Sequence, residues 1–83
     1  MIKLDLTEAE LCRRLALNVR ARRLALALTL KKAGERADIY WRYWQKIEAA
    51  EVRPTLLTLV RLSHALAVEP AELLRETAAP LAQ

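Results

Sequence analysis

Four neighbouring residues in the middle of the chain carry side chains that suit contact with nucleobases. Trp41 is followed directly by Arg42, and Gln45 and Lys46 come one helical turn later. Arginine and lysine can bond O6 and N7 of guanine, glutamine can pair with N6 and N7 of adenine, and an indole can lie against a thymine methyl group. If the segment is a helix, residues advance by 100° each, so these four side chains share one side.

The opposite side of the same segment is apolar. It carries Tyr40, Tyr43, Trp44 and Ile47, and aromatic residues at helical spacing are more often core residues than stacking platforms. We therefore predict that this side packs against the rest of the protein and that the polar side faces solvent. An ordinary solvated surface remains the alternative interpretation for Gln45 and Lys46.

Capping signals predict five helices that would hold this segment in place. Thr7 with Glu10 forms a capping box, Thr29 and Thr55 are suitable N-caps, and Pro70 suits a first helical turn. The expected helices are 8–25 (or 26), 30–36, 40–49, 56–66 and 70–76. Leu56, Leu59, Val60, Ser63 and Leu66 form the expected inner stripe of the fourth helix.

The composition favours the same fold class. Of 83 residues, 54% are apolar, and most of these are leucine or alanine, which are strong helix formers. We predict an all-α, compact five-helix bundle, in one domain spanning 1–83 with a short frayed tail at 77–83. The second and third expected helices, joined by a turn at Asp38, would form a helix-turn-helix.

Charge is distributed unevenly along the chain. Residues 11–46 contain ten Lys or Arg and two acids, whereas the rest contain four bases and eight acids. A basic half is typical of proteins that bind polyanions, although solvated helix faces would give a similar count. Uncharged stretches such as Leu24 to Leu30 reach only seven residues, far short of the roughly twenty that a membrane span needs.

The residues of common catalytic and metal sites are scarce. Ser63 and His64 are adjacent, so on a helix they point about 100° apart and do not form a nucleophile and base pair. Cys12 is the only cysteine, which excludes an internal disulfide, and we expect it to be a buried or half-buried small apolar residue. We expect no catalytic activity, no metal and no cofactor. A free cysteine and the absence of a secretory signal favour the cytoplasm.

From about residue 15 to 76 the chain resembles the Xre family of lambda-repressor-like helix-turn-helix regulators. The matching residues are Val19-Arg20, Arg23, Leu28-Thr29, Ile39, Tyr43 to Glu48, Pro54 to Leu56, Thr58-Leu59, Leu62, Ala65-Leu66, Val68 and Glu72 to Leu74. The resemblance implies a DNA-binding transcription regulator, a repressor acting as a homodimer on an inverted repeat, with the third helix in the major groove of double-stranded DNA.

The resemblance also assigns roles to individual residues. The positions that match Trp41, Arg42, Gln45 and Lys46 are the usual base and phosphate contacts, and Arg53 is placed like residues that touch phosphate. Arg23 and Glu48 match an ion pair that links the first helix to the end of the recognition helix; two exposed charges are the alternative.

Four positions depart from the family pattern. Leu30 replaces the glutamine that contacts a phosphate at the start of the second helix, and Gly34 replaces a small packing alanine. Asp38 replaces the turn glycine, and Tyr40 replaces the hydroxyl residue that caps the recognition helix. These departures alter the expected backbone contacts and leave the fold intact.

Extra apolar positions suggest a partner surface. Leu17, Ala21 and Leu24 share one line on the first helix, away from Leu11 and Leu15, and Leu57 lies on the far side of the fourth. Scattered exposed leucines would be an ordinary alternative. A second function therefore stays open: an antitoxin or anti-activator that binds protein on the same scaffold and contacts DNA weakly.

Overall fold

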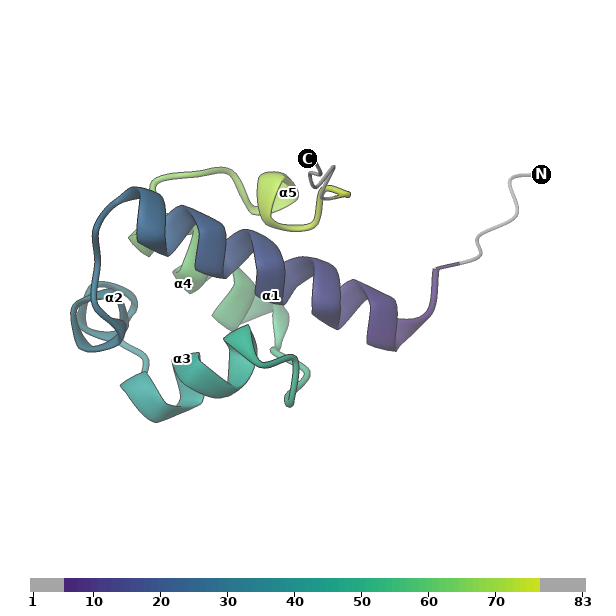
Figure 1. Cartoon of the computed structure of the whole chain (residues 1–83), viewed down its shortest axis with the longest axis horizontal. Helices are drawn as coiled ribbons and strands as arrows, with labels where there is room; N and C mark the ends of the chain where they lie inside the picture. Colours follow the sequence, from purple (N-terminus) through teal and green to yellow (C-terminus); the bar gives the residue numbers. More distant parts are fainter. Residues whose placement is uncertain (1–5, 77–83) are drawn as a thin grey trace.

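Five helices form the part of the chain that the structure describes. The structure, a computed structural model, describes residues 6–76; the expected frayed tail at 77–83 lies outside this range. The helices are α1 (Glu8–Ala25), α2 (Leu30–Ala37), α3 (Trp41–Glu48), α4 (Leu56–Ala65) and α5 (Pro70–Leu73), and no strand occurs in 6–76. The all-α, five-helix prediction is confirmed (Figure 1).

Side-chain caps fix three of the helix starts. The Thr7 hydroxyl accepts the N–H of Glu10, and the Glu10 carboxylate accepts the N–H of Thr7 in return. Thr29 and Thr55 each accept the N–H three residues further on, at 3.0 and 3.1 Å. Each bond satisfies an N–H group that the first helical turn would otherwise leave unpaired.

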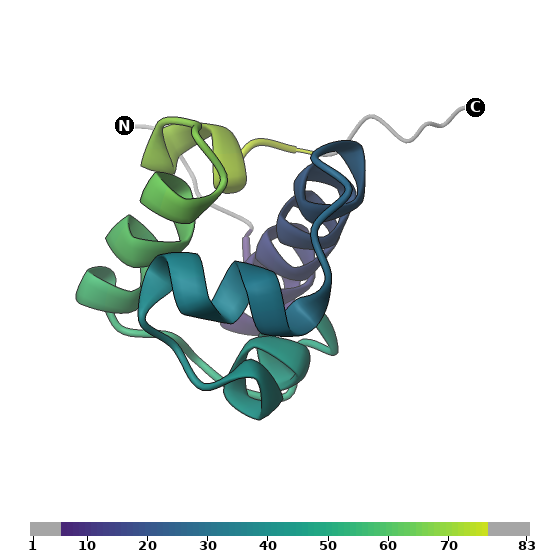
Figure 2. The ribbon, with the colours of Figure 1, turned by 90° about the vertical axis from the view of Figure 1, so that its left-hand side faces the viewer.

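The long helix α1 packs mainly against two of the other helices. It packs against α3 and α5, while α2 packs against α3 and α4 (Figures 1 and 2). The side chains that fill the space between them are leucine, valine, isoleucine and one tryptophan: Val19, Trp44, Ile47, Leu62, Leu66 and Leu73, all fully buried. Trp44 and Ile47 anchor α3 in this core, so the opposite side of α3 is fixed toward solvent.

Two parts of the predicted core are wrong. Tyr40 is 66% exposed, because it is the N-cap of α3 with extended backbone (φ −59°, ψ 132°), and helical rotation does not apply to a residue outside the helix. Leu56 and Val60 are 81% and 52% exposed. The side of α4 that packs against the core carries Leu59, Leu62 and Leu66, and Leu56 and Val60 are rotated away from it.

Alanine occupies left-handed backbone at three helix ends. Ala27, Ala50 and Ala67 have φ of 57°, 58° and 56°. After α4, the N–H of Ala67 bonds the carbonyl of His64 and the N–H of Val68 bonds that of Ser63, which closes the helix. Glycine is the residue that adopts this conformation without steric strain.

We therefore expect Ala67→Gly to raise the free energy of unfolding by about 0.5–1 kcal/mol. The strain energy that glycine relieves in the folded state is larger than the free-energy cost of the extra conformational freedom that it gives the unfolded chain. Denaturant melts measure the change. Ala21→Gly, an exposed site inside α1, is the matched control and should lose about 1 kcal/mol. Destabilisation by both variants would show that no strain resides at Ala67.

Candidate nucleic-acid interface

The turn between α2 and α3 depends on a close backbone approach. Asp38 adopts left-handed backbone (φ 56°, ψ 45°), and the N–H of Ile39 bonds the carbonyl of Gly34 at 2.9 Å. A Cβ at Gly34 would lie 2.4 Å from the carbonyl oxygen of Ile39. Glycine therefore replaces the usual alanine because no side chain fits here, and α2 packs directly on the start of α3.

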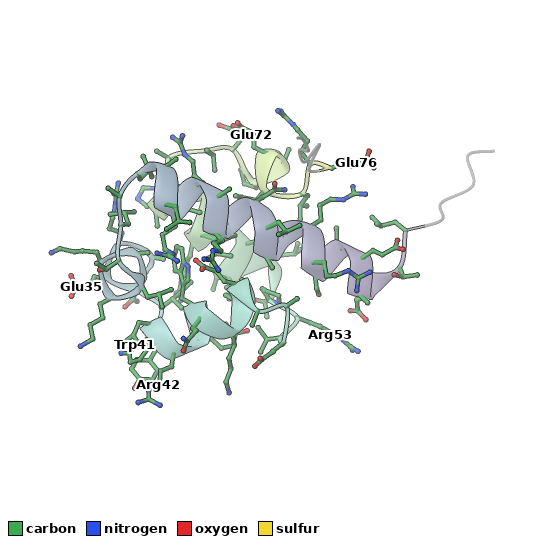
Figure 3. The ribbon with its side chains drawn as sticks, viewed as in Figure 1. Glu35, Trp41, Arg42, Arg53, Glu72 and Glu76 are labelled. Atoms are coloured by element: carbon green, nitrogen blue, oxygen red, sulfur yellow. The ribbon has the colours of Figure 1, made fainter. Side chains whose placement is uncertain are left out.

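The polar side of α3 is accessible. Arg42, Gln45 and Lys46 are exposed and Trp41 is half-buried. Arg42, Gln45 and Lys46 line one shallow depression at the end of α3. In Figure 3, Trp41 and Arg42 project from the start of α3, away from the rest of the bundle. The structure thus brings the four residues that the sequence singled out onto one surface.

Trp41 contacts two cationic groups. The Arg42 guanidinium carbon lies 5.0 Å from the indole centroid, and Nζ of Lys31, on α2, lies 5.9 Å from it. The Tyr40 ring lies 6.0 Å away at 59°. Lys31 is not predicted by the spacing of residues on α3; its signal in the sequence is the Lys31-Lys32 pair at the start of α2.

Arg53 flanks the other end of α3. It lies in the loop before α4, on the same side of the molecule as Arg42 (Figure 3). Its guanidinium pairs with Glu8 at 3.3 Å, and both side chains are mostly exposed. An exposed ion pair of this kind is worth less than about 1 kcal/mol, so a phosphate can compete with Glu8 for Arg53.

A buried ion pair fixes the orientation of α3. Arg23 donates two hydrogen bonds to Glu48, from Nε at 2.6 Å and from Nη2 at 3.0 Å, and a third to the carbonyl of Leu28 at 2.9 Å. Nε1 of Trp44 also donates to Glu48 at 2.6 Å. The side chains of the pair are only 11% and 8% exposed.

The bond to Glu48 raises the pKa of the Arg23 guanidinium above its ordinary value, more than burial lowers it. The stability that this shift contributes is fully present below the unfolded-state pKa and is lost only as pH rises through the folded-state pKa. Arg23 therefore stays charged and paired across the neutral range.

Residues 6–76 contain no group of three or more His, Cys, Asp or Glu placed to hold a metal ion. Within the same range, no helix combines the length and the hydropathy that crossing a bilayer would require. Cys12 is half-buried beside Leu11 and Leu15, as expected for a small apolar residue.

Two solved structures have a fold similar to that of this chain. The restriction-modification controller protein C.AhdI from Aeromonas hydrophila superposes with a TM-score of 0.73 and 22% identity, over 75% of this chain and 94% of that one. The hypothetical transcription factor NHTF from Neisseria superposes with a TM-score of 0.81 and 21% identity, over 98% of this chain and 94% of that one. The chain has the lambda-repressor-like helix-turn-helix fold. No family model and no curated protein matches the sequence.

Within this helix-turn-helix fold, α2 and α3 are the two helices of the motif. The superposition on NHTF covers nearly the whole chain, so the five helices belong to one shared architecture. The expected lambda-repressor-like fold is thereby confirmed, and α3 is the second helix of the helix-turn-helix.

Proposed function

We propose that this chain is a sequence-specific DNA-binding transcription regulator, a cytoplasmic repressor that binds an inverted repeat as a homodimer with α3 in the major groove. One observation carries the proposal: Arg42, Gln45 and Lys46 are exposed together on the second helix of a helix-turn-helix whose other side is anchored in the core. Guanidinium, amide and ammonium groups bond base edges in the major groove.

Contacts to phosphate groups would fix the position of α3 along the DNA duplex. Arg53 flanks α3, and its partner Glu8 is exposed, so exchanging that carboxylate for a phosphate costs little. Residues 11–46, which include most of α1, all of α2 and most of α3, carry a net charge of +8 from ten bases and two acids. Such contacts position the protein on the duplex and carry no sequence information.

Exposed apolar side chains on α4 support the homodimer. Leu56, Leu57 and Val60 are all more than half exposed, and they follow directly on the loop that contains Arg53. A second copy docked there would bury these side chains near the DNA-facing side of each subunit, which keeps both α3 helices available to one duplex. Leu56 also borders an apolar groove formed by Leu11, Cys12, Leu15, Leu59 and Leu74, which extends the surface.

We predict steep weakening of DNA binding with salt. Each Lys or Arg contact to phosphate releases counterions and contributes about −0.9 to the slope of log K against log salt. Four to eight contacts per dimer would give a slope between about −4 and −7. Titration of a labelled duplex at several salt concentrations, read by fluorescence anisotropy, measures it.

The same titration separates DNA binding from the protein-interaction function. Wild-type protein that binds no duplex at low salt, or binds with a flat salt dependence, would contradict the proposal and favour the antitoxin or anti-activator role. Arg75→Ala is the control: it is an exposed arginine just after α5, which packs on α1 on the side away from α3 (Figure 1), and it should leave the slope unchanged.

A further inference from the structure

The indole of Trp41 lies next to one cation from each helix of the helix-turn-helix. Arg42 comes from α3 and Lys31 from α2, and their charged groups lie 5.0 and 5.9 Å from the same ring centroid. A cation within about 6 Å of an aromatic face is attracted by the ring quadrupole, and tryptophan attracts it most strongly. The ring therefore restrains two long side chains that would otherwise sample many rotamers.

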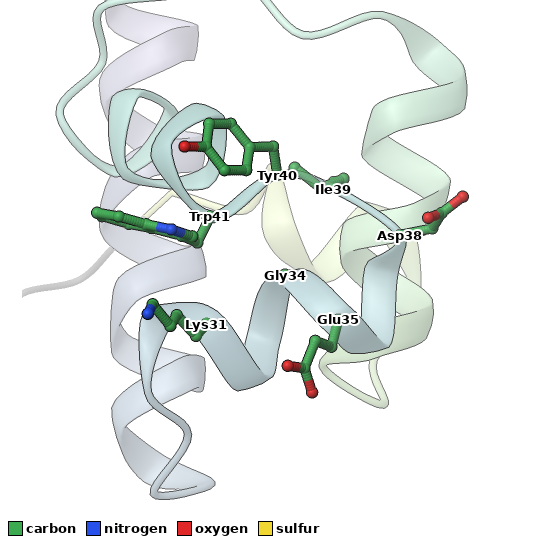
Figure 4. Close-up of a pocket in the computed structure, with 7 residues that line it drawn as sticks. All are labelled: Lys31, Gly34, Glu35, Asp38, Ile39, Tyr40 and Trp41. Atoms are coloured by element: carbon green, nitrogen blue, oxygen red, sulfur yellow. The ribbon is translucent and has the colours of Figure 1, made fainter.

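The backbone of Trp41 is itself restrained from α2. A Cβ at Gly34 would be only 3.4 Å from both N and Cα of Trp41, so α2 runs closely along the start of α3. Lys31, Gly34, Tyr40 and Trp41 line one cavity of about 340 Å³ at this junction (Figure 4). The position of the indole is thus fixed relative to α2 as well as α3.

The two lysines of α2 have different neighbours. Lys32 pairs with Glu35 at 3.6 Å, whereas the ammonium group of Lys31 lies beside the Trp41 ring and the Glu35 carboxylate points away from it (Figure 4). A ring attracts two cations but does not neutralise them. Lys31 and Arg42 therefore both keep their positive charge beside the indole and remain able to bind groups on a nucleic acid.

We propose that Trp41 is a positioning residue that holds Arg42 for base contact and Lys31 for phosphate contact. Lys31 then adds a phosphate contact from α2, beside Leu30, whose apolar side chain cannot make one. This inference rests on the proposed function and deepens it: the base reader on α3 and the phosphate contact on α2 act as one unit because both bind the same indole.

A double-mutant cycle on the preferred duplex tests the link between Trp41 and Arg42. In wild-type protein, Arg42→Ala should weaken binding about tenfold. In a Trp41→Leu background, which keeps apolar bulk and removes the ring, the same change should cost less than about threefold, because Arg42 is no longer held. Trp41→Phe, which retains an aromatic face, should restore most of the Arg42 effect.

Lys32 is the matched control for the phosphate contact proposed for Lys31. Lys31→Ala should lower the salt slope by about 0.9 per protomer on preferred and random DNA alike, and Lys32→Ala should leave it unchanged. Equal effects of the two lysine variants, or additive effects in the Trp41–Arg42 cycle, would overturn the proposal.

A measurement on the free protein separates this inference from the proposed function. The side-chain protons of Lys31 and Arg42 should show ring-current shifts in NMR spectra that vanish in Trp41→Leu, while the melting temperature stays unchanged. Shifts without any DNA binding by the wild type would contradict both proposals. DNA binding without the shifts would contradict this one alone.

Discussion

Replacement of Glu48 by alanine is expected to lower the free energy of unfolding by about 3–5 kcal/mol, because it leaves the Arg23 guanidinium buried without its partner. The same change removes the acceptor of the Trp44 indole N–H. An 83-residue domain has a total stability of roughly 5–10 kcal/mol, so the variant will lose most of its stability. Chemical denaturation followed by circular dichroism measures the loss.

Two further variants isolate the cause. Glu51→Ala removes an exposed carboxylate three residues away and should change stability by less than about 0.5 kcal/mol. Glu48→Gln keeps an acceptor for Trp44 and should lose less than the alanine variant. Because an arginine guanidinium stays protonated throughout the neutral range with or without Glu48, the loss in Glu48→Ala should be constant between about pH 6 and 9.

A Glu48→Ala protein that melts within a degree or two of wild type would contradict this account of the pair. It would mean that water or another group compensates Arg23, since about 1 kcal/mol shifts the melting temperature of a domain this small by 4–8 °C. The orientation of α3 would then have to depend on Trp44 and Ile47 alone.

The second large effect concerns DNA specificity. Arg42→Ala and Gln45→Ala should each cost about 1–3 kcal/mol on the preferred site and much less on random DNA, because each removes side-chain bonds to base edges. Arg53→Ala should weaken binding to both duplexes nearly equally, because a phosphate contact is present on any sequence. Competition titrations with the two duplexes give both values.

Arg53→Ala serves as the control for Arg42→Ala and Gln45→Ala, because the assigned roles predict loss of discrimination between the two duplexes only in the latter two variants. Loss of discrimination in Arg53→Ala together with retained discrimination in Arg42→Ala would reverse the assigned roles. Glu8→Gln adds a check on Arg53: it releases the arginine from its carboxylate partner and should modestly strengthen binding to both duplexes.

Much of the fold follows from local signals in the sequence. Thr7, Thr29 and Thr55 mark three helix starts that the structure reproduces, because a side-chain cap depends only on residues three positions apart. The exposed side of α3 follows from periodicity in the same way. Both features depend on residues that lie close together along the chain, so a single sequence is enough to predict them.

Tertiary features were harder to predict. Periodicity predicts Tyr40 in the core, but the helix begins one residue later. On α4, Leu56 and Val60 are rotated away from the side that packs against the core, so they are exposed. In the sequence Gly34 is only a departure from the family's alanine, whereas the structure shows that the carbonyl of Ile39 leaves no room for a side chain there. The contact of Lys31 with Trp41 joins two helices and has no signature in spacing along the chain.

Selection from a pool of random duplexes tests most directly whether α3 reads DNA sequence. Wild-type protein should enrich an inverted repeat with half-sites about one helical turn apart, as a two-fold dimer requires. Arg42→Ala should select sequences that are relaxed at one position in each half-site, while Arg53→Ala should enrich the wild-type motif. Enrichment of an unchanged motif by Arg42→Ala, or of no motif by the wild type, would contradict the assignment of α3 as the recognition helix.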